Sequence, residues 1–530
     1  MNTQQLSLPP QSDSSQAGMQ EVIILKRRGE HEQARNKANQ LLAHFPQCIA
    51  SLHLNYQLAI ADSNFIEAEG YLREALKILP EHPVLLLNQA QLSLSRYQYA
   101  AAVKLADKAA AVYVGNNTVF LAAISKVVMQ AEQPAIAISV YQRMLAVEPD
   151  NTHFKHQLAL CYFFTNQPQK AYILLNEVIA KSPNNAGAIH LRSALQTYTN
   201  DHNHIEDLRK FVADVASQHP AIYYALAKEL EDIADYKESF AMLKQGAALM
   251  RKQLCYNEAA ELKSIADIIK STTDIVVDSL VQESSGPIFI VGMPRTGTTL
   301  VERVLTQHED VHSVGELSLF PQLLASMAQQ YMAQHKSVGS LHEAALKIDF
   351  AELGRRYTIA VAEISAGKPY TLDKLPINFL YCGFIKKALP NARIIHLCRN
   401  PMDSCYAIFK TLFINAYSFS YDLDELANYY ITYKNIMAHW HSVMPGAILD
   451  VHYEEMVNDA AKTTQRLVQW CGLTYKSELL EFHKADSVST TASAAQVRKP
   501  IYKSSVEKWR NVETELTALQ FKLKQAGVVF

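Results

Sequence analysis

The segment IFIVGMPRTGTTLVERVL, residues 288–305, has the residue types of an anion-binding turn. An apolar run that predicts a buried strand is followed by a turn rich in glycine and threonine, and then by an amphipathic helix. Consecutive backbone N–H groups in such a turn, with the N-terminus of the following helix, form a cradle for an anion. Arg295 adds a positive charge to this cradle. We therefore expect an anion site here, and the alternative is a tight strand–helix turn without a ligand.

The same turn is close to the nucleotide-binding pattern G-x-x-x-x-G-K-[ST], but it lacks the lysine of that pattern. Gly292, Gly297 and Thr299 fit, whereas Thr298 stands at the lysine position. Without this lysine, the usual contact to the β- and γ-phosphates of a nucleotide is missing. The sequence therefore disfavours a nucleoside-triphosphate hydrolase or kinase.

The composition indicates that any anion site is local. The 530 residues include 50 Lys and Arg against 52 Asp and Glu, a net charge of −2. This balance argues against binding of nucleic acid or of a membrane surface over a large area. The seven cysteines form no CxxC pair, no HExxH occurs and the histidines are scattered, so we expect no metal. Because no secretory signal or long apolar segment is visible, we expect a cytoplasmic chain without a membrane span.

An internal repeat occupies the first half of the chain. Small residues recur every 34 or 35 residues, as expected where the backbones of two antiparallel helices cross closely. These residues are Ala34, Ala68, Ala102, Ala137 and Ala171. Prolines, which end a helix because they lack an N–H, keep the same period at Pro46, Pro80, Pro149 and Pro183.

This period and pattern resemble the tetratricopeptide repeat (TPR). The pattern weakens after Pro183, but Ser239 falls two periods after Ala171, so degenerate repeats are expected to about residue 270. Such repeats stack into a solenoid whose concave face binds peptides or protein surfaces. We therefore expect a protein or peptide partner. The alternative is that the solenoid packs on its own neighbouring domain or on a second copy of the chain, as a homodimer.

In the second half the helical period gives way to short apolar runs that predict buried strands. These runs are 287–292, 392–398 and 446–453. Helical stretches lie between them, which predicts an α/β domain with a parallel sheet. The expected order is a flexible tail at 1–18, an α-helical TPR solenoid at 19–270, a junction at 271–285 and the α/β domain at 286–530.

Four motifs of this α/β domain resemble, in the same order, those of the sulfotransferase family. They are GMPRTGTT in the turn, RNPMDSCYAIFK (399–410), HYEEMV (452–457) and VRKPIYKSSVEKW (497–509). By motif, the domain resembles in particular the tyrosylprotein sulfotransferases and bacterial TPR-linked sulfotransferases. The resemblance implies a P-loop-like domain that moves a sulfuryl group from 3'-phosphoadenylyl sulfate (PAPS) to a hydroxyl. The nucleotide product is 3'-phosphoadenosine 5'-phosphate (PAP), and no metal is implied.

The resemblance also implies which residues bind the donor. They are Arg295, Thr296, Gly297, Thr298 and Thr299 for the 5'-phosphosulfate, Arg399 for the 3'-phosphate, Tyr453 near the adenine, and Ser493 and Lys508 as late donor-binding positions. One position departs from the family, because Ala407 replaces a serine that contacts the 3'-phosphate. Ser404 and Thr411 share its helical face and are the candidates to compensate.

Sulfuryl transfer needs a base for the acceptor hydroxyl and positive charge at the leaving phosphate. VGELSLFP (314–321) resembles the family segment with the glutamate base, so Glu316 is the expected general base. His312 is the competing base, one turn earlier if this segment is helical. LDKLP (372–376) resembles the segment whose lysine contacts the bridging oxygen, which makes Lys374 the expected stabiliser of the leaving group, assisted by Arg295.

We therefore expect a PAPS-dependent sulfotransferase, with tyrosine of a protein or peptide as the first candidate acceptor. Carbohydrate and small phenol acceptors stay open, because a fold-level likeness does not fix a substrate. The alternative is a non-catalytic TPR scaffold with a nucleotide-binding domain of the sulfotransferase type. Ala407 favours this alternative, whereas the presence of Glu316, Lys374 and Arg399 argues against it.

Overall fold

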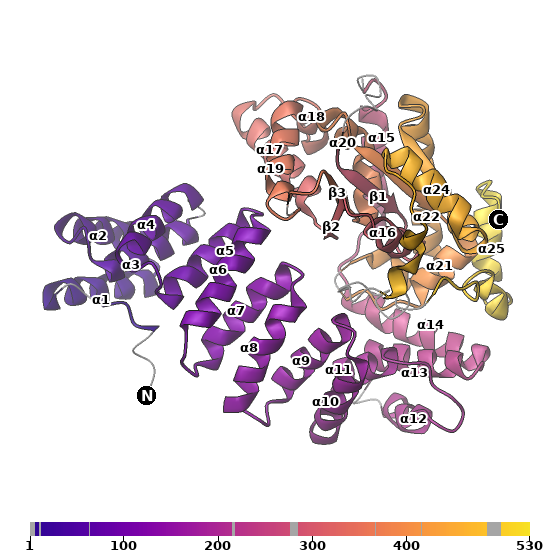
Figure 1. The fold of residues 1–530 in the computed structure, drawn as a ribbon, viewed down its shortest axis with the longest axis horizontal. Coiled ribbons are helices and arrows are strands. Elements are labelled where there is room, and N and C mark those ends of the chain that lie inside the picture. The colour runs from indigo at the N-terminus through magenta and orange to yellow at the C-terminus, as the bar shows by residue number, and fades with distance from the viewer. Residues whose placement is uncertain are drawn as a thin grey trace. The chain divides into compact units, whose positions relative to one another are not determined.

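The computed structural model describes residues 6–9, 12–62, 64–214, 218–275, 285–365, 367–414, 416–484 and 500–530 (Figure 1). The chain forms two compact units, Met1–Cys161 and Tyr162–Phe530. The helical repeat and the α/β fold that the sequence predicts are both present.

The first unit consists of helices. They are α1 (Asp13–Arg27), α2 (His31–His44), α3 (Ile49–Ala61), α4 (Phe65–Ile78), α5 (Pro83–Ser95), α6 (Tyr99–Val112), α7 (Thr118–Gln130), α8 (Pro134–Val147) and the start of α9 (Thr152–Phe164). The first of them begins inside the segment that the composition assigns to a flexible tail. Ser12 caps it, because its side chain accepts a hydrogen bond from the N–H of Ser15 at 3.2 Å.

The repeat positions have the structural role that the sequence predicts. Each of the five repeat alanines has an exposed fraction of 0%, and so has Ser239. Each repeat proline follows the end of a helix by two residues, at the ends of α2, α4, α8 and α10. The turn within a pair keeps the same period, with a left-handed backbone at Tyr97, Glu132, Asn166 and Ala234. The pattern therefore fixes both the close crossing and the turn of each helix pair.

The second unit begins with further helices and continues into the sheet domain. The helices before the sheet are α10 (Pro168–Lys181), α11 (Ala186–Ala194), α12 (Ile205–Ala213), α13 (Pro220–Asp232), α14 (Tyr236–Gln253) and α15 (Glu258–Ser271). The helices around the sheet are α16 (Thr298–Leu305), α17 (Leu319–Gln334), α18 (Leu341–Ala345), α19 (Phe350–Ala362), α20 (Cys382–Ala388), α21 (Pro401–Phe409), α22 (Leu423–Val443), α23 (Tyr453–Asn458), α24 (Ala460–Cys471) and α25 (Thr517–Gln525).

The sheet has the order β2-β3-β1-β4-β5, and all of its pairings are parallel. The three strands predicted from apolar runs are confirmed as β1 (Ile288–Gly292), β4 (Arg393–Cys398) and β5 (Ile448–His452). The sequence missed β2 (Val311–Gly315) and β3 (Tyr370–Asp373). Both are only partly buried and mix polar with apolar residues, so they lack the apolar run of a central parallel strand.

Helices cover both faces of the sheet. On one face, Ile290 and Leu397 belong to a buried core with residues of α16 and α24. On the other face, the Phe289 ring packs edge-on against Phe320 of α17. All strands are parallel, so their carboxyl ends meet at one edge of the sheet. This edge carries the glycine- and threonine-rich turn after β1, and Arg399 after β4.

The last helices of the helical region share a core with the sheet domain. The Tyr224 hydroxyl of α13 donates to the carbonyl of Phe409 in α21 at 3.1 Å. Phe240 of α14 packs against the Phe409 ring with centroids 5.7 Å apart. Glu231 of α13 forms an ion pair with Lys410, directly after α21, at 2.8 Å. Helices α13 and α14 therefore support the helix that follows Arg399.

Candidate functional site

The turn between β1 and α16 has the backbone of an anion cradle. Arg295 and Gly297 are both left-handed, with φ of 65° and 102°. The Thr296 hydroxyl donates to the carbonyl of Met293 at 2.7 Å, which closes the turn. Thr298 then starts α16, where the first N–H groups have no partner within the helix. This geometry turns successive N–H groups toward one place, as an anion site requires.

Two further sequence motifs meet at this turn. A Cβ at Gly297 would lie 2.6 Å from Cδ2 of Tyr453, so only glycine permits the close approach of this ring. The Arg399 guanidinium lies 4.8 Å from the centre of the Tyr453 ring. One of its nitrogens, Nη1, donates to the carbonyl of Arg295 at 2.8 Å. The fold therefore brings together the turn, the start of the second motif and the tyrosine of the third.

The site has an excess of positive charge. Burial, and next the charge of Arg399, lower the pKa of Arg295 to about 10. Burial also raises the pKa of Tyr453, although Arg399 opposes this shift. Nε of Arg399 is buried and has no hydrogen-bond partner among the described residues. Two guanidinium groups whose charges interact at an N–H cradle are the electrostatic setting that a phosphate group stabilises.

Glu316 and Lys374, the expected catalytic pair, are in contact. Glu316 comes directly after β2 and Lys374 directly after β3, which is the neighbouring strand. Oε1 of Glu316 pairs with Nζ of Lys374, whose side chain has an exposed fraction of 0%. The backbone N–H of Lys374 donates to the carbonyl of Gly315 at 3.0 Å, and this bond joins the carboxyl ends of β2 and β3. The structure thus places a carboxylate and an ammonium group at the carboxyl edge of the sheet.

A second carboxylate, which sequence reasoning missed, lies at the same lysine. Oε2 of Glu302 in α16 is 3.6 Å from Nζ of Lys374. The Ser313 hydroxyl donates to Oε1 of Glu302 at 2.5 Å. No spacing in the chain relates Glu302 to Lys374, because the contact forms between a helix and a distant strand end. The buried ammonium group is thereby held by two carboxylates.

His312, the competing base, does not lie one helical turn from Glu316. Residues 311–315 form strand β2, and a strand rises about 3.3 Å per residue. Four positions along β2, which is irregular between Ser313 and Gly315, therefore hold the two backbones further apart than a helical turn would. Burial, and next the charge of Lys368, lower the pKa of His312. The contact with Lys374 belongs to Glu316.

The second motif forms α21, and Asn400 caps it by accepting from the N–H groups of Met402 and Asp403. Ser404 is fully buried, and its hydroxyl lies 3.4 Å from the carbonyl of Arg399. The Thr411 hydroxyl donates to the carbonyl of Ala407 at 2.8 Å. Both hydroxyls that were expected to compensate for Ala407 thus have partners in the backbone of the motif.

We predict that Ala407→Ser tightens the binding of PAP. If α21 faces the 3'-phosphate, the added hydroxyl gains a bond to an ionised group, about 1.5–3 kcal/mol before the cost of displacing water. Calorimetry with PAP and with adenosine 5'-phosphate measures this, and the gain should be absent for the nucleotide without the 3'-phosphate. Unchanged PAP affinity in Ala407→Ser, Ser404→Ala and Thr411→Val alike would place this phosphate elsewhere.

Lys508, one of the two late positions, lies in a partly buried ion-pair group. Its segment is tied to α21 because the Asp403 carboxylate accepts from the N–H groups of Glu507 at 2.7 Å and Trp509 at 3.1 Å. Lys508 itself pairs with Glu231 of α13, which also pairs with Lys410. Ser493, the other late position, lies outside the described residues.

The charge state of this group follows from its partners. Burial alone would raise the pKa of Glu231, but the charges of Lys410 and Lys508 lower it to about 2. Burial lowers the pKa of Lys410 to about 8 although Glu231 opposes this shift, and the charge of Arg295 contributes to the lowering. Glu231 is therefore an ionised carboxylate that pairs with both Lys410 and Lys508. The charge of Lys410 in turn interacts with that of Arg295 in the turn after β1.

Among the described residues, no helix combines the length and the apolar character that crossing a bilayer requires.

Comparisons with known proteins agree with both parts of the resemblance. Residues 287–477 match the model of the sulfotransferase family, and residues 128–195 match a tetratricopeptide repeat model. The expected combination of TPR repeats with a domain of the sulfotransferase type is confirmed.

Among curated proteins, an uncharacterized protein of Aquifex aeolicus is 34% identical over 305 residues, which are 56% of this chain and 40% of that protein. Protein-tyrosine sulfotransferase 1 of Danio rerio is 24% identical over 241 residues, 42% of this chain and 65% of that protein. The chain thus spans less than two thirds of the length of either relative. Among solved structures, the sulfotransferase domain of a Synechococcus olefin synthase is 19% identical, with a TM-score of 0.33, and the match covers 47% of this chain and 96% of that domain.

Proposed function

We propose that this chain transfers a sulfuryl group from PAPS to a hydroxyl acceptor. The observation that carries the proposal is the contact of the Arg399 guanidinium with the carbonyl of Arg295, which brings two arginines to the N–H cradle after β1. This set of groups fits a nucleotide with phosphates at both its 5' and 3' positions. The buried, unpartnered Nε of Arg399 supports the fit, since a phosphate oxygen would satisfy it.

In the proposed reaction PAPS supplies an activated sulfuryl group, and the chain's own residues position it and move a proton. Glu316 takes the proton of the acceptor hydroxyl as its oxygen bonds to sulfur. The bond from sulfur to the bridging oxygen of the 5'-phosphate breaks, and PAP leaves. Lys374 and Arg295 stabilise the negative charge that develops on this phosphate. The contact with Lys374 holds the Glu316 carboxylate in place before an acceptor binds.

The acceptor that we propose is a tyrosine of a protein or peptide, bound with help from the TPR repeats. The support is the similarity to protein-tyrosine sulfotransferases together with the repeat region, since solenoids of this kind bind peptides and protein surfaces. A cytoplasmic location belongs to the same proposal, and it is supported by seven cysteines that are all free thiols. A non-catalytic scaffold is the rival function, and only Ala407 favours it.

The nucleotide part of this proposal is tested by binding PAP to the purified chain. We expect Arg295→Ala to weaken PAP binding about 10–150-fold, because a hydrogen bond to a charged group contributes about 1.5–3 kcal/mol. Isothermal calorimetry provides the measurement. Arg510→Ala is the matched control, since Arg510 is exposed and pairs with Glu507 outside the cradle. Tighter binding of ATP than of PAP would overturn the sulfotransferase assignment.

A further inference from the structure

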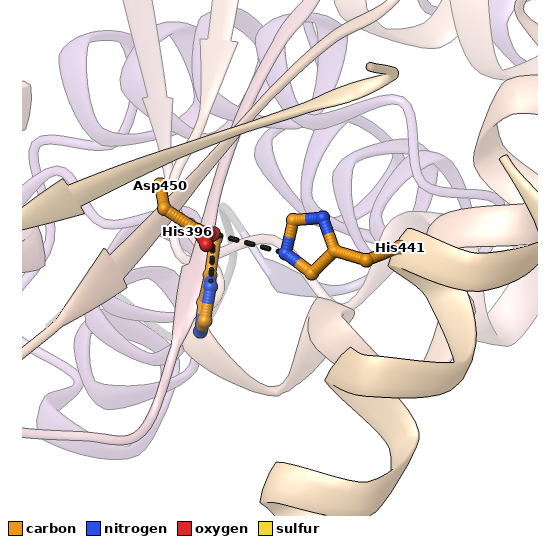
Figure 2. Close-up of side chains that lie close together, drawn as sticks. All are labelled: His396, His441 and Asp450. Atoms are coloured by element: carbon orange, nitrogen blue, oxygen red, sulfur yellow. Dashed lines mark hydrogen bonds and ion pairs between the residues drawn. The ribbon is translucent and has the colours of Figure 1, made fainter. Parts of the chain in front are cut away.

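A cluster of two histidines and one aspartate lies on the sheet face opposite the core of Ile395 and Leu397. His396 of β4 and Asp450 of β5 are directly paired residues of neighbouring parallel strands. His441 reaches them from α22 (Figure 2). Three separate elements therefore supply the three side chains.

The ligand atoms of this cluster converge on one place. Nδ1 of His396 lies 2.7 Å from Oδ1 of Asp450, and Nε2 of His441 lies 3.1 Å from the same oxygen (Figure 2). All three atoms lie within 4.8 Å of one another. A tetrahedral metal with ligand distances of about 2.0–2.1 Å separates its ligand atoms by about 3.3 Å. The two nitrogen–oxygen distances therefore have to lengthen only slightly to admit an ion.

We propose that His396, His441 and Asp450 form a binding site for a divalent transition metal such as Zn²⁺ or Co²⁺. The ligands are Nδ1 of His396, Nε2 of His441 and Oδ1 of Asp450, and the fourth position is open to water. Two imidazole nitrogens with one carboxylate suit zinc and its neighbours, whereas magnesium and calcium prefer oxygen ligands throughout.

The surroundings of the cluster fit such a site. The His396 side chain is 2% exposed, and its second nitrogen, Nε2, contacts the Tyr433 hydroxyl, which fixes the ring as outer partners of metal ligands do. His441 and Asp450 are 36% and 41% exposed, so an ion can enter from that side. Sγ of Cys398 lies 3.5 Å from Nδ1 of His396 and adds a soft donor at the edge of the cluster.

Metal binding changes which ring nitrogen of each histidine carries a proton. In the empty cluster, hydrogen bonds join each ring to Asp450. With a metal bound, the proton of His396 moves to Nε2, where the Tyr433 hydroxyl accepts it, and that of His441 moves to Nδ1. The alternative is a purely structural hydrogen-bond network of the same three side chains, which binds no metal.

A bound metal would hold the ends of two strands that carry candidate donor-binding residues. Arg399 follows His396 by three residues, and Tyr453 follows Asp450 by three residues. The site would therefore clamp β4, β5 and α22 behind the nucleotide site, without taking part in sulfuryl transfer.

Co²⁺ binding to the full chain, freed of metal with a chelator, tests this proposal. We expect one Co²⁺ per chain with the strong visible absorption of tetrahedral coordination, displaced by Zn²⁺ and not by Mg²⁺. His441→Ala should abolish the absorption while circular dichroism shows an unchanged fold, since His441 is partly exposed. His452→Ala is the matched control, because His452 is exposed on the same strand as Asp450 and lies outside the cluster.

Two results would overturn the metal site. One is an absorption spectrum no different from that of aqueous Co²⁺, which identifies the cluster as a hydrogen-bond network. The other is equal Co²⁺ binding by wild type and His441→Ala, which places the ion elsewhere on the chain.

Discussion

Glu316→Gln is expected to lower the rate of sulfuryl transfer by about 10²–10⁴-fold, the usual contribution of a general base. Glutamine keeps the size of the side chain and an oxygen that accepts from Lys374, but it cannot take the proton of the acceptor. Lys374 also keeps its second carboxylate, Glu302, at 3.6 Å. PAP binding should therefore stay close to that of the wild type. Steady-state rates with saturating donor, together with calorimetry of PAP, give the two quantities.

His312→Ala is the control for this assignment. It removes the competing base, which lies on β2 with three residues between it and Glu316. We expect a small effect on turnover. A loss of turnover in His312→Ala, combined with nearly normal turnover in Glu316→Gln, would transfer the role of base to the histidine.

Glu231→Gln is expected to destabilise the second unit by about 1.5–3 kcal/mol, the range for a hydrogen bond to a charged group. The substitution removes the shared carboxylate of Lys410 and Lys508, whose side chains are 21% and 35% exposed. Urea unfolding followed by circular dichroism measures the loss of stability.

Glu206→Gln provides the matched comparison, since Glu206 pairs with Arg209 on α12 and is 80% exposed. Exposed ion pairs contribute little to stability, so this variant should unfold like the wild type. Equal stability of Glu231→Gln and Glu206→Gln would mean that the contacts of α13 with α21 do not depend on the buried charge.

Local patterns in the sequence were sufficient to predict most of the fold. The repeat alanines are buried because each lies where two helices cross, a requirement that recurs with every pair. Strands β1, β4 and β5 were visible because each contains consecutive apolar residues, such as Ile394 and Ile395 in β4 and Ile448 and Leu449 in β5. Strands β2 and β3 were not, since their half-exposed positions carry polar residues such as Ser313 and Thr371.

The candidate site was predictable only where a motif holds its residues close together in the chain. The turn around Arg295 is such a motif, and the resemblance added Glu316 and Lys374. Glu302 and Glu231 carry no such signal, because their partners are distant in sequence and the contacts depend on helix packing. The cluster of His396, His441 and Asp450 also carries no signal in the sequence, because its residues do not have a spacing typical of a metal site.

Transfer of labelled sulfate from PAPS is the most direct test of the central claim. The full chain is incubated with PAPS carrying radioactive sulfur and with a panel of tyrosine peptides, carbohydrates and phenols, beside Glu316→Gln as the inactive control. The account predicts label on at least one hydroxyl acceptor, with one PAP released for each sulfuryl group transferred, and almost none with the variant. PAP that binds tightly while no acceptor in the panel gains label, or label transfer that is equal in Glu316→Gln, would contradict it.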